Sequence, residues 1–234
     1  MNPKKFLRFP RRNHILAYAL LVTNSIQIEQ SPAWLSENLV NKVAARVESR
    51  LEWSLRRLNG KFYKSKVEFE SAHGFPNSPI IAFYRSSSKE IHFGPQVSKA
   101  NFEAVYAHEL AHAVVAQKYK THLPKWLEEG LANWTADKNE VNWLELSKLF
   151  PRMDPREAAH PFLASEITQT QARYTVSLAA LQFLKKKCPS FRELLNLSLN
   201  KDLESFMNSY CKIKDLKTDF WAYVDRKVKL KSNY

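Results

Sequence analysis

One short segment of the chain has residue types and a spacing that suit it to hold a metal ion and to activate water. It reads His108-Glu109-Leu110-Ala111-His112, an HExxH pattern inside an apolar stretch with helical character. Residues four apart lie on one face of an α-helix, about 6 Å from each other, so both imidazoles can reach one Zn²⁺ at about 2.0–2.1 Å. Glu109 lies about 100° around the helix and can contact a metal-bound water without being a ligand. Zinc lowers the pKa of such a water from about 15.7 to about 7, and Glu109 can then take its proton as general base.

A second segment, Leu123-Pro-Lys-Trp-Leu-Glu-Glu-Gly-Leu-Ala-Asn-Trp134, follows shortly after. Together the two segments resemble the gluzincin zinc metallopeptidases, in texture most of all the peptidase MA-like group. In that group a W-L-x-E-G-x-A helix follows the active-site helix, and the Glu before Gly is the third zinc ligand. The resemblance is specific over residues 100–135. It implies Glu129 as the third ligand, Gly130 as the point where the two helices approach closely, one Zn²⁺ per chain, and a peptide or protein substrate.

The resemblance also implies roles for residues outside the two segments. Tyr174 lies where the group often has a tyrosine aimed at the developing oxyanion; the structural alternative is a tyrosine buried in a helix-packing face. Asn133 occupies the position of an acidic residue that orients a zinc-bound histidine in thermolysin-like relatives; the alternative is a solvent-facing side chain. Residues 91–93 are the candidate edge strand for pairing with the substrate backbone.

Two other residues compete with Glu129 for the third ligand position. Glu128 is adjacent, and sequence distance alone does not separate the two carboxylates. On a helix they point about 100° apart, and Glu128 aligns with Lys125 and Ala132, which predicts that it faces solvent. His122, nine residues after the HExxH segment, is the weaker alternative, because it immediately precedes Leu-Pro and fits a loop.

The pattern of apolar residues predicts the elements that must position these side chains. A long helix is expected from about residue 36 to Leu58, where Asn59-Gly60 would end it. Short β-like runs and Gly, Pro and Ser clusters then predict a small antiparallel sheet. Further helices and one proline-rich loop should follow. The strands are expected at 67–69, 80–84 and 91–93, the helices at 101–118, 124–137, 168–187, 190–210 and 215–230, and the loop at 151–161.

These elements predict a helix-dominated α+β protein. The resemblance implies a zincin-like, thermolysin-like catalytic domain, with a small antiparallel sheet lobe and an all-α C-terminal lobe. With 234 residues, 44% hydrophobic and 25% charged, the chain has the composition of one globular domain. We place that domain at residues 31–234, with an α+β lobe at 31–118 and a helical lobe at 119–234.

The N-terminus predicts export. Basic residues up to Arg12 precede an apolar run at 15–22 and the small polar residues Thr23 to Ser25, which is the order of a secretory signal. Residues 1–30 are therefore assigned to a signal peptide, with cleavage after Ser25, or to an N-terminal membrane anchor; a cytoplasmic protein is the alternative. Cys188 and Cys211 would form a disulfide in an exported protein, and without a CxxC spacing they do not suggest a zinc site.

Two other functions are weighed against an exported zinc peptidase. The net charge of +13 and the HExxH segment are shared with SprT-like, DNA-associated zinc proteases, but that type lacks the W-L-E-E-G-L-A segment. Five of the positive charges lie in the first twelve residues, so we expect no nucleic-acid partner. A non-catalytic binding protein with a zincin fold is the other alternative, and the complete set of His108, Glu109, His112 and Glu129 argues against it.

Overall fold

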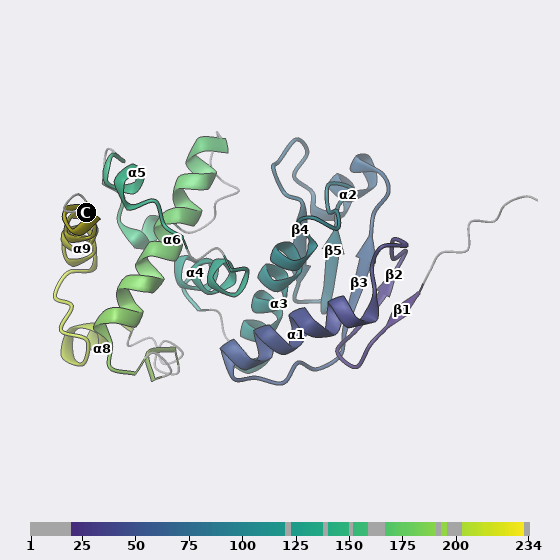
Figure 1. Ribbon diagram of the computed structural model, residues 1–234, viewed down its shortest axis with the longest axis horizontal. Coiled ribbons are helices and arrows are strands. Elements are labelled where there is room, and N and C mark those ends of the chain that lie inside the picture. Colours follow the sequence, from purple (N-terminus) through teal and green to yellow (C-terminus); the bar gives the residue numbers. More distant parts are fainter. Residues whose placement is uncertain are drawn as a thin grey trace, which may run out of the picture.

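The computed structural model describes residues 20–119, 123–137, 140–149, 152–158, 167–190, 193–195 and 203–231. Over these residues the chain is an α+β protein in which a sheet with its helices and a group of further helices lie side by side (Figure 1). Helix α4 (Lys125–Thr135) lies between the two parts in this view, so the residues it carries can face both.

The sheet has five strands in the order β1-β2-β3-β5-β4 and is mixed, so the prediction of an antiparallel sheet is wrong. The pairs β2–β3 and β3–β5 are parallel, whereas β1–β2 and β4–β5 are antiparallel. Parallel pairs require a crossover, which helix α1 (Glu37–Leu51) supplies between β2 and β3. The strands are β1 (Leu21–Val22), β2 (Ile26–Glu29), β3 (Leu58–Phe62), β4 (Ala82–Arg85) and β5 (Glu90–Phe93).

The segment at 67–69, predicted as a strand, belongs instead to helix α2 (Lys66–His73). Ser65 caps this helix and accepts a hydrogen bond from the backbone N–H of Glu68, and Gly74 ends it at φ 79°. The Ser65-x-x-Glu68 spacing is a helix-start signal that outweighs the β-like run. Val67 is 72% exposed, so its apolar side chain does not indicate a buried strand.

Helix α1 begins after Ser36, as predicted, but it ends at Leu51 and not at Leu58. Glu52 adopts a left-handed conformation, and the Glu48 side chain accepts a hydrogen bond from the Leu55 backbone, which turns the chain away from the helix axis. Leu58 then begins β3 and is fully buried in the sheet. The helical spacing of apolar residues continues across this turn. It therefore predicts one helix where the chain forms a helix and a strand.

The helices of the second half follow the sequence prediction more closely. Those predicted at 101–118, 124–137, 168–187 and 215–230 are confirmed with bounds shifted by one or two residues, while the one predicted at 190–210 is described as a helix mainly at its end. A short 3₁₀ helix lies within the predicted loop. The elements are α3 (Phe102–Tyr119), α4, α5 (Trp143–Ser147), η1 (Pro155–Ala158), α6 (Ile167–Lys187), α8 (Leu203–Ser209) and α9 (Leu216–Lys231).

The described part of the segment assigned to a leader is folded into the sheet. Ile26 and Ile28 of β2 are fully buried, so the core includes residues that precede position 31. Residues 1–19, which hold the basic and most of the apolar part of the leader, lie outside the described residues. Within the described part of the chain, no helix has the length and apolar character that crossing a membrane requires. Export and membrane anchoring stay predictions.

Cys188 and Cys211 form a disulfide, with their Cα atoms 4.4 Å apart. Cys188 directly follows α6, and Cys211 lies two residues after α8. The predicted pairing is therefore confirmed, and it ties the end of α6 to the segment that leads into α9.

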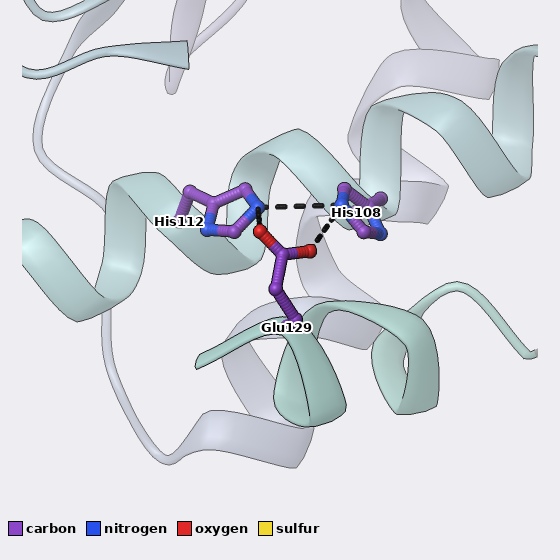
Figure 2. A group of neighbouring side chains, drawn as sticks. All are labelled: His108, His112 and Glu129. Carbon is purple, nitrogen blue, oxygen red and sulfur yellow. Dashed lines mark hydrogen bonds and ion pairs between the residues drawn. The ribbon is translucent and has the colours of Figure 1, made fainter. Parts of the chain in front are cut away.

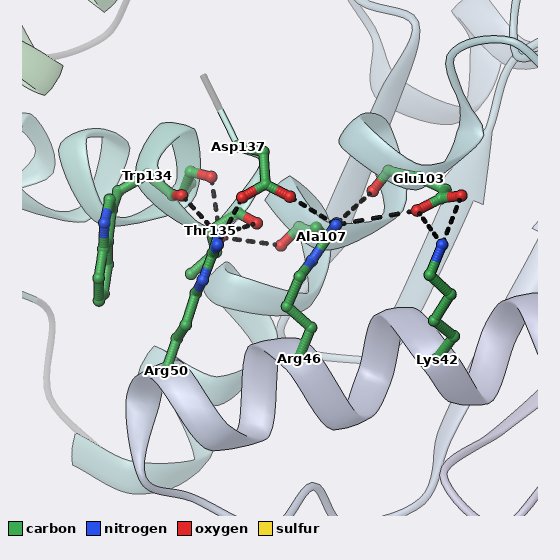
Figure 3. Close-up of polar contacts among 9 residues, drawn as sticks. Lys42, Arg46, Arg50, Glu103, Ala107, Trp134, Thr135 and Asp137 are labelled. Carbon is green, nitrogen blue, oxygen red and sulfur yellow. Dashed lines mark hydrogen bonds and ion pairs between the residues drawn. The ribbon is translucent and has the colours of Figure 1, made fainter. Parts of the chain in front are cut away.

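A group of ion pairs joins α1 to the end of α4 (Figure 3). Arg46 and Arg50 both contact the carboxylate of Asp137 at 2.5 Å. Arg50 also donates to the carbonyl oxygens of Trp134 and Thr135, at 3.0 and 3.1 Å, where α4 has no basic residue of its own in its last turn. We call Arg46, Arg50 and Asp137 the clasp. It places positive charge at the negative end of α4 and fixes that end to α1.

Candidate metal centre

Helices α3 and α4 bring the predicted ligands together. His108 and His112 project from the same side of α3, and Glu129 reaches them from α4 (Figure 2). The remaining sides of α3 are packed, since Tyr106, Ala107 and Leu110 are fully buried. The two histidines are partly exposed and line a cleft, together with neighbouring residues of the same helix.

The candidate ligand atoms lie close enough together for one metal ion to contact all three residues. His108 Nε2 lies 3.3 Å from His112 Nε2 and 3.4 Å from Glu129 Oε2, and His112 Nε2 lies 3.8 Å from Glu129 Oε1. Ligand atoms bound to tetrahedral zinc at about 2.0–2.2 Å are about 3.3–3.6 Å apart. His108, His112 and Glu129 form a group that can hold a metal ion, and the described residues contain no other group of this kind.

The surroundings of Glu129 are suited to bind a cation. Its side chain is buried, yet its Oε2 atom makes no hydrogen bond. Burial by itself would raise its pKa, but the neighbouring His112 and His108 outweigh burial and lower it, so the carboxylate is held in its charged form. A buried, charged carboxylate beside two imidazoles is the donor set of a metal site.

Glu109 lines the cleft beside these ligands without joining them. Its side chain is buried, and burial raises its pKa, while the two histidines and a hydrogen bond from the Tyr84 backbone oppose the increase. A carboxylate whose pKa is raised is a better proton acceptor than one in water. Its position in α3 and its contact with β4 place it between the metal ligands and the sheet.

Glu128 does not face solvent, and that prediction is wrong. It is buried, its Oε1 lies 2.7 Å from His112 Nδ1, and Lys125 contacts its other oxygen at 3.1 Å. The hydrogen bond to His112 and the charge of Lys125 overcome burial and hold the pKa of Glu128 at about 2. Burial disfavours the charged form of His112, but Glu129 and Glu128 together raise its pKa to about 9. Glu128 therefore holds Nδ1 of His112 and turns Nε2 toward the metal position.

Tyr174 and Asn133 meet different surroundings. The Tyr174 ring lies 6.0 Å from the His108 ring, edge to face, and lines the same cleft. Burial and the carboxylates of Glu129 and Glu109 raise the pKa of Tyr174, so its hydroxyl stays a hydrogen-bond donor.

Asn133 is 1% exposed, but neither of its amide atoms nor Nδ1 of His108 has a hydrogen-bond partner. The structure therefore does not join Asn133 to a histidine in the way the sequence suggested.

Gly130 permits a close approach of helices, but the neighbour is α6 and not α3. A Cβ atom at this position would lie 2.6 Å from the backbone oxygen of Ser177 and 3.1 Å from Cβ of Leu181. Ser177 is one turn beyond Tyr174 on the same helix. The glycine thus sets the separation between the helix that carries Glu129 and the helix that carries Tyr174.

The ligands open into a cleft of about 490 Å³ whose other wall is the edge of the sheet. Residues 91–93, predicted as the edge strand, lie in β5, which is internal because it pairs with both β3 and β4. The edge is β4, and residues 79–84 line the cleft. His122, the alternative ligand, lies outside the described residues.

No protein family matches this chain, and a comparison with curated proteins found no relative.

Proposed function

We propose that this chain is a zinc-dependent metallopeptidase of the gluzincin type, with a zincin-like catalytic domain. The observation that carries the proposal is the convergence of His108, His112 and Glu129 in one cleft, with Glu109 beside them and outside the ligand set. Two imidazoles and one carboxylate are a known ligand set of catalytic zinc, and they leave a fourth position open.

Each residue of the cleft has a place in peptide hydrolysis. When bound, zinc supplies a Lewis acid and lowers the pKa of a water molecule to near neutrality. Glu109 takes the proton of the attacking water and delivers it to the leaving amine. Tyr174, protonated and facing the cleft, donates a hydrogen bond to the developing oxyanion. The outer edge of β4 offers backbone groups for an extended substrate, apart from the Tyr84 group that is bonded to Glu109.

The disulfide supports the proposal that the protein works outside the cytosol. Structural disulfides persist in oxidising compartments and are rare among cytosolic and nuclear proteins. A Cys188–Cys211 bond therefore favours an exported or membrane-anchored peptidase over a SprT-like, DNA-associated protease.

The proposal is tested by the pair Glu109→Gln and Glu129→Gln in the full chain. Glu109→Gln should retain one zinc per chain and lose cleavage of an unfolded protein by a factor of about 10² or more, because the base is not a ligand. Glu129→Gln should lose both the bound zinc and the cleavage activity. Elemental analysis and a cleavage assay on the same preparations give both readings. Full activity of Glu109→Gln, or a wild type that binds no zinc, would refute the proposal.

A further inference from the structure

A second hollow lies next to the metal cleft, between the end of α4 and the first half of α6, and has a volume of about 790 Å³. Tyr174 lines both spaces, so the two adjoin at this side chain. Its lining is mostly polar, whereas residues 79–84 give the metal cleft a mostly apolar wall. We call it the polar hollow; its polar lining is Asn133, Asp137, Glu140, Gln171, Tyr174 and Thr175.

Asn133 is a buried residue of the polar hollow whose side-chain atoms lack partners. Its side chain is 99% buried, and neither its amide oxygen nor its amide nitrogen has a hydrogen-bond partner. Buried polar atoms are nearly always paired, because leaving one unpaired carries the full penalty of removing it from water. A carboxamide that lines a hollow and lacks partners is therefore suited to receive them from a ligand.

The remaining walls include hydrogen-bond acceptors. The Thr175 hydroxyl donates to the backbone oxygen of Gln171 at 2.9 Å, which leaves its lone pairs for an incoming donor. Glu140 is exposed at the rim and has no ion pair among the described residues. Asp137 is held by the two arginines of the clasp, so within the described part of the chain Glu140 is the carboxylate of this lining that has no ion pair.

We propose that the polar hollow is a substrate subsite for a basic side chain, Arg or Lys, of a polypeptide whose backbone passes the metal. An ammonium or guanidinium group is rich in donors and has no acceptor, which matches the carboxylate of Glu140, the amide oxygen of Asn133 and the hydroxyl oxygen of Thr175. The inference rests on the proposed peptidase function for the path of the substrate. It assigns an acidic subsite to a protein whose net charge is +13 and whose charge alone would favour acidic partners.

Peptide binding to the full-length Glu109→Gln variant tests the subsite without requiring turnover. Fluorescent peptides that differ at one position, which carries Arg, Gln, Leu or Glu, are measured by anisotropy in the presence of zinc, with the position moved along the peptide. At one position the Arg peptide should bind about tenfold or more tightly than the Leu or Glu peptide, the range for hydrogen bonds to a charged group. Adding Glu140→Gln should remove most of this preference and leave the affinity for the Leu peptide unchanged.

Glu145→Gln is the matched control. It removes a carboxylate from α5 that pairs with Lys148 and does not line either space, so the Arg preference should stay intact. Equal affinity for the four peptides, a preference for Gln, or a preference that survives Glu140→Gln would overturn the inference. Cleavage by the wild type is measured separately. An Arg preference without cleavage would refute the peptidase function and support the subsite. Cleavage without the preference would support the peptidase function and refute the subsite.

Discussion

Glu128 and Glu129 are adjacent carboxylates with different partners, and this difference can be measured. Glu129 faces Nε2 of both histidines, whereas Glu128 contacts Nδ1 of His112. We expect Glu129→Ala to abolish tight zinc binding and Glu128→Ala to weaken it by about 10–100-fold, the usual cost of losing a group that orients a ligand. Competition with a chromogenic chelator measures both, and Glu145→Ala serves as an exposed control. A Glu128→Ala variant within twofold of the wild type would show that this carboxylate has no part in the site.

The sequence was sufficient to find the three residues that the structure brings together as a possible metal site, but not the position of Glu128. His108 and His112 follow from helix geometry alone, because a spacing of four fixes the face they share. The resemblance to the gluzincin peptidases points to Glu129 as the third candidate ligand. The direction of Glu128 depends on how α4 crosses α3, which no spacing within α4 contains. Lys125, which lies three residues before Glu128, is the one local sign in the sequence that the Glu128 carboxylate has a partner.

At the scale of elements, the contact of α4 with α6 depends on Gly130. Gly130→Ala gains up to about 1 kcal/mol of helix propensity, but the new methyl group would lie 2.6 Å from the Ser177 backbone oxygen, which cannot move as a side chain can. Overpacking of this kind costs about 1–3 kcal/mol. We therefore expect a net loss of unfolding free energy in urea, and lower activity because Glu129 and Tyr174 move apart. A variant as stable and as active as the wild type would contradict the close approach.

The clasp should matter to the metal as well as to stability. Arg50→Met removes an ion pair with Asp137 and two hydrogen bonds to the last carbonyl groups of α4. We expect a loss of about 1–3 kcal/mol in unfolding free energy and a severalfold weaker affinity for zinc, because α4 carries Glu129. Lys42→Met on the same helix is the control: the Lys42 side chain is 68% exposed and its one ion pair among the described residues is with Glu103, so its loss should change stability by at most about 1 kcal/mol. Equal effects of the two substitutions would argue against the clasp.

The elements that carry the site were predictable, and those of the sheet were less so. Helices α3 and α4 have long apolar patterns, and Pro124 marks the start of α4. Residues 66–73 combine a short apolar run with the Ser65–Glu68 cap, and the cap decided the outcome. Strand direction depends on connections, so the sequence pattern gave strands near β4 and β5 but not the parallel pairs around β3.

At the scale of the whole molecule, the disulfide should stabilise the helical part. It closes a loop with a sequence separation of 23 residues, for which loop entropy predicts about 3 kcal/mol. Urea unfolding of the wild type should shift to a lower midpoint when a reductant is added, and the double variant Cys188→Ser/Cys211→Ser should show the lower midpoint with or without reductant. A wild-type midpoint that does not respond to reductant, in protein shown to be reduced, would contradict this contribution.

The central claim concerns the metal and the reaction together, and a zinc titration of the metal-free chain tests it most directly. The protein is stripped with a chelator, zinc is added back in steps, and the initial rate of cleavage of an unfolded protein is recorded at each step. The account predicts no cleavage without zinc and a rate that rises linearly and levels off at one zinc per chain, because His108, His112 and Glu129 form one site. Cleavage that persists in the stripped chain, or no cleavage at full zinc occupancy, would contradict it.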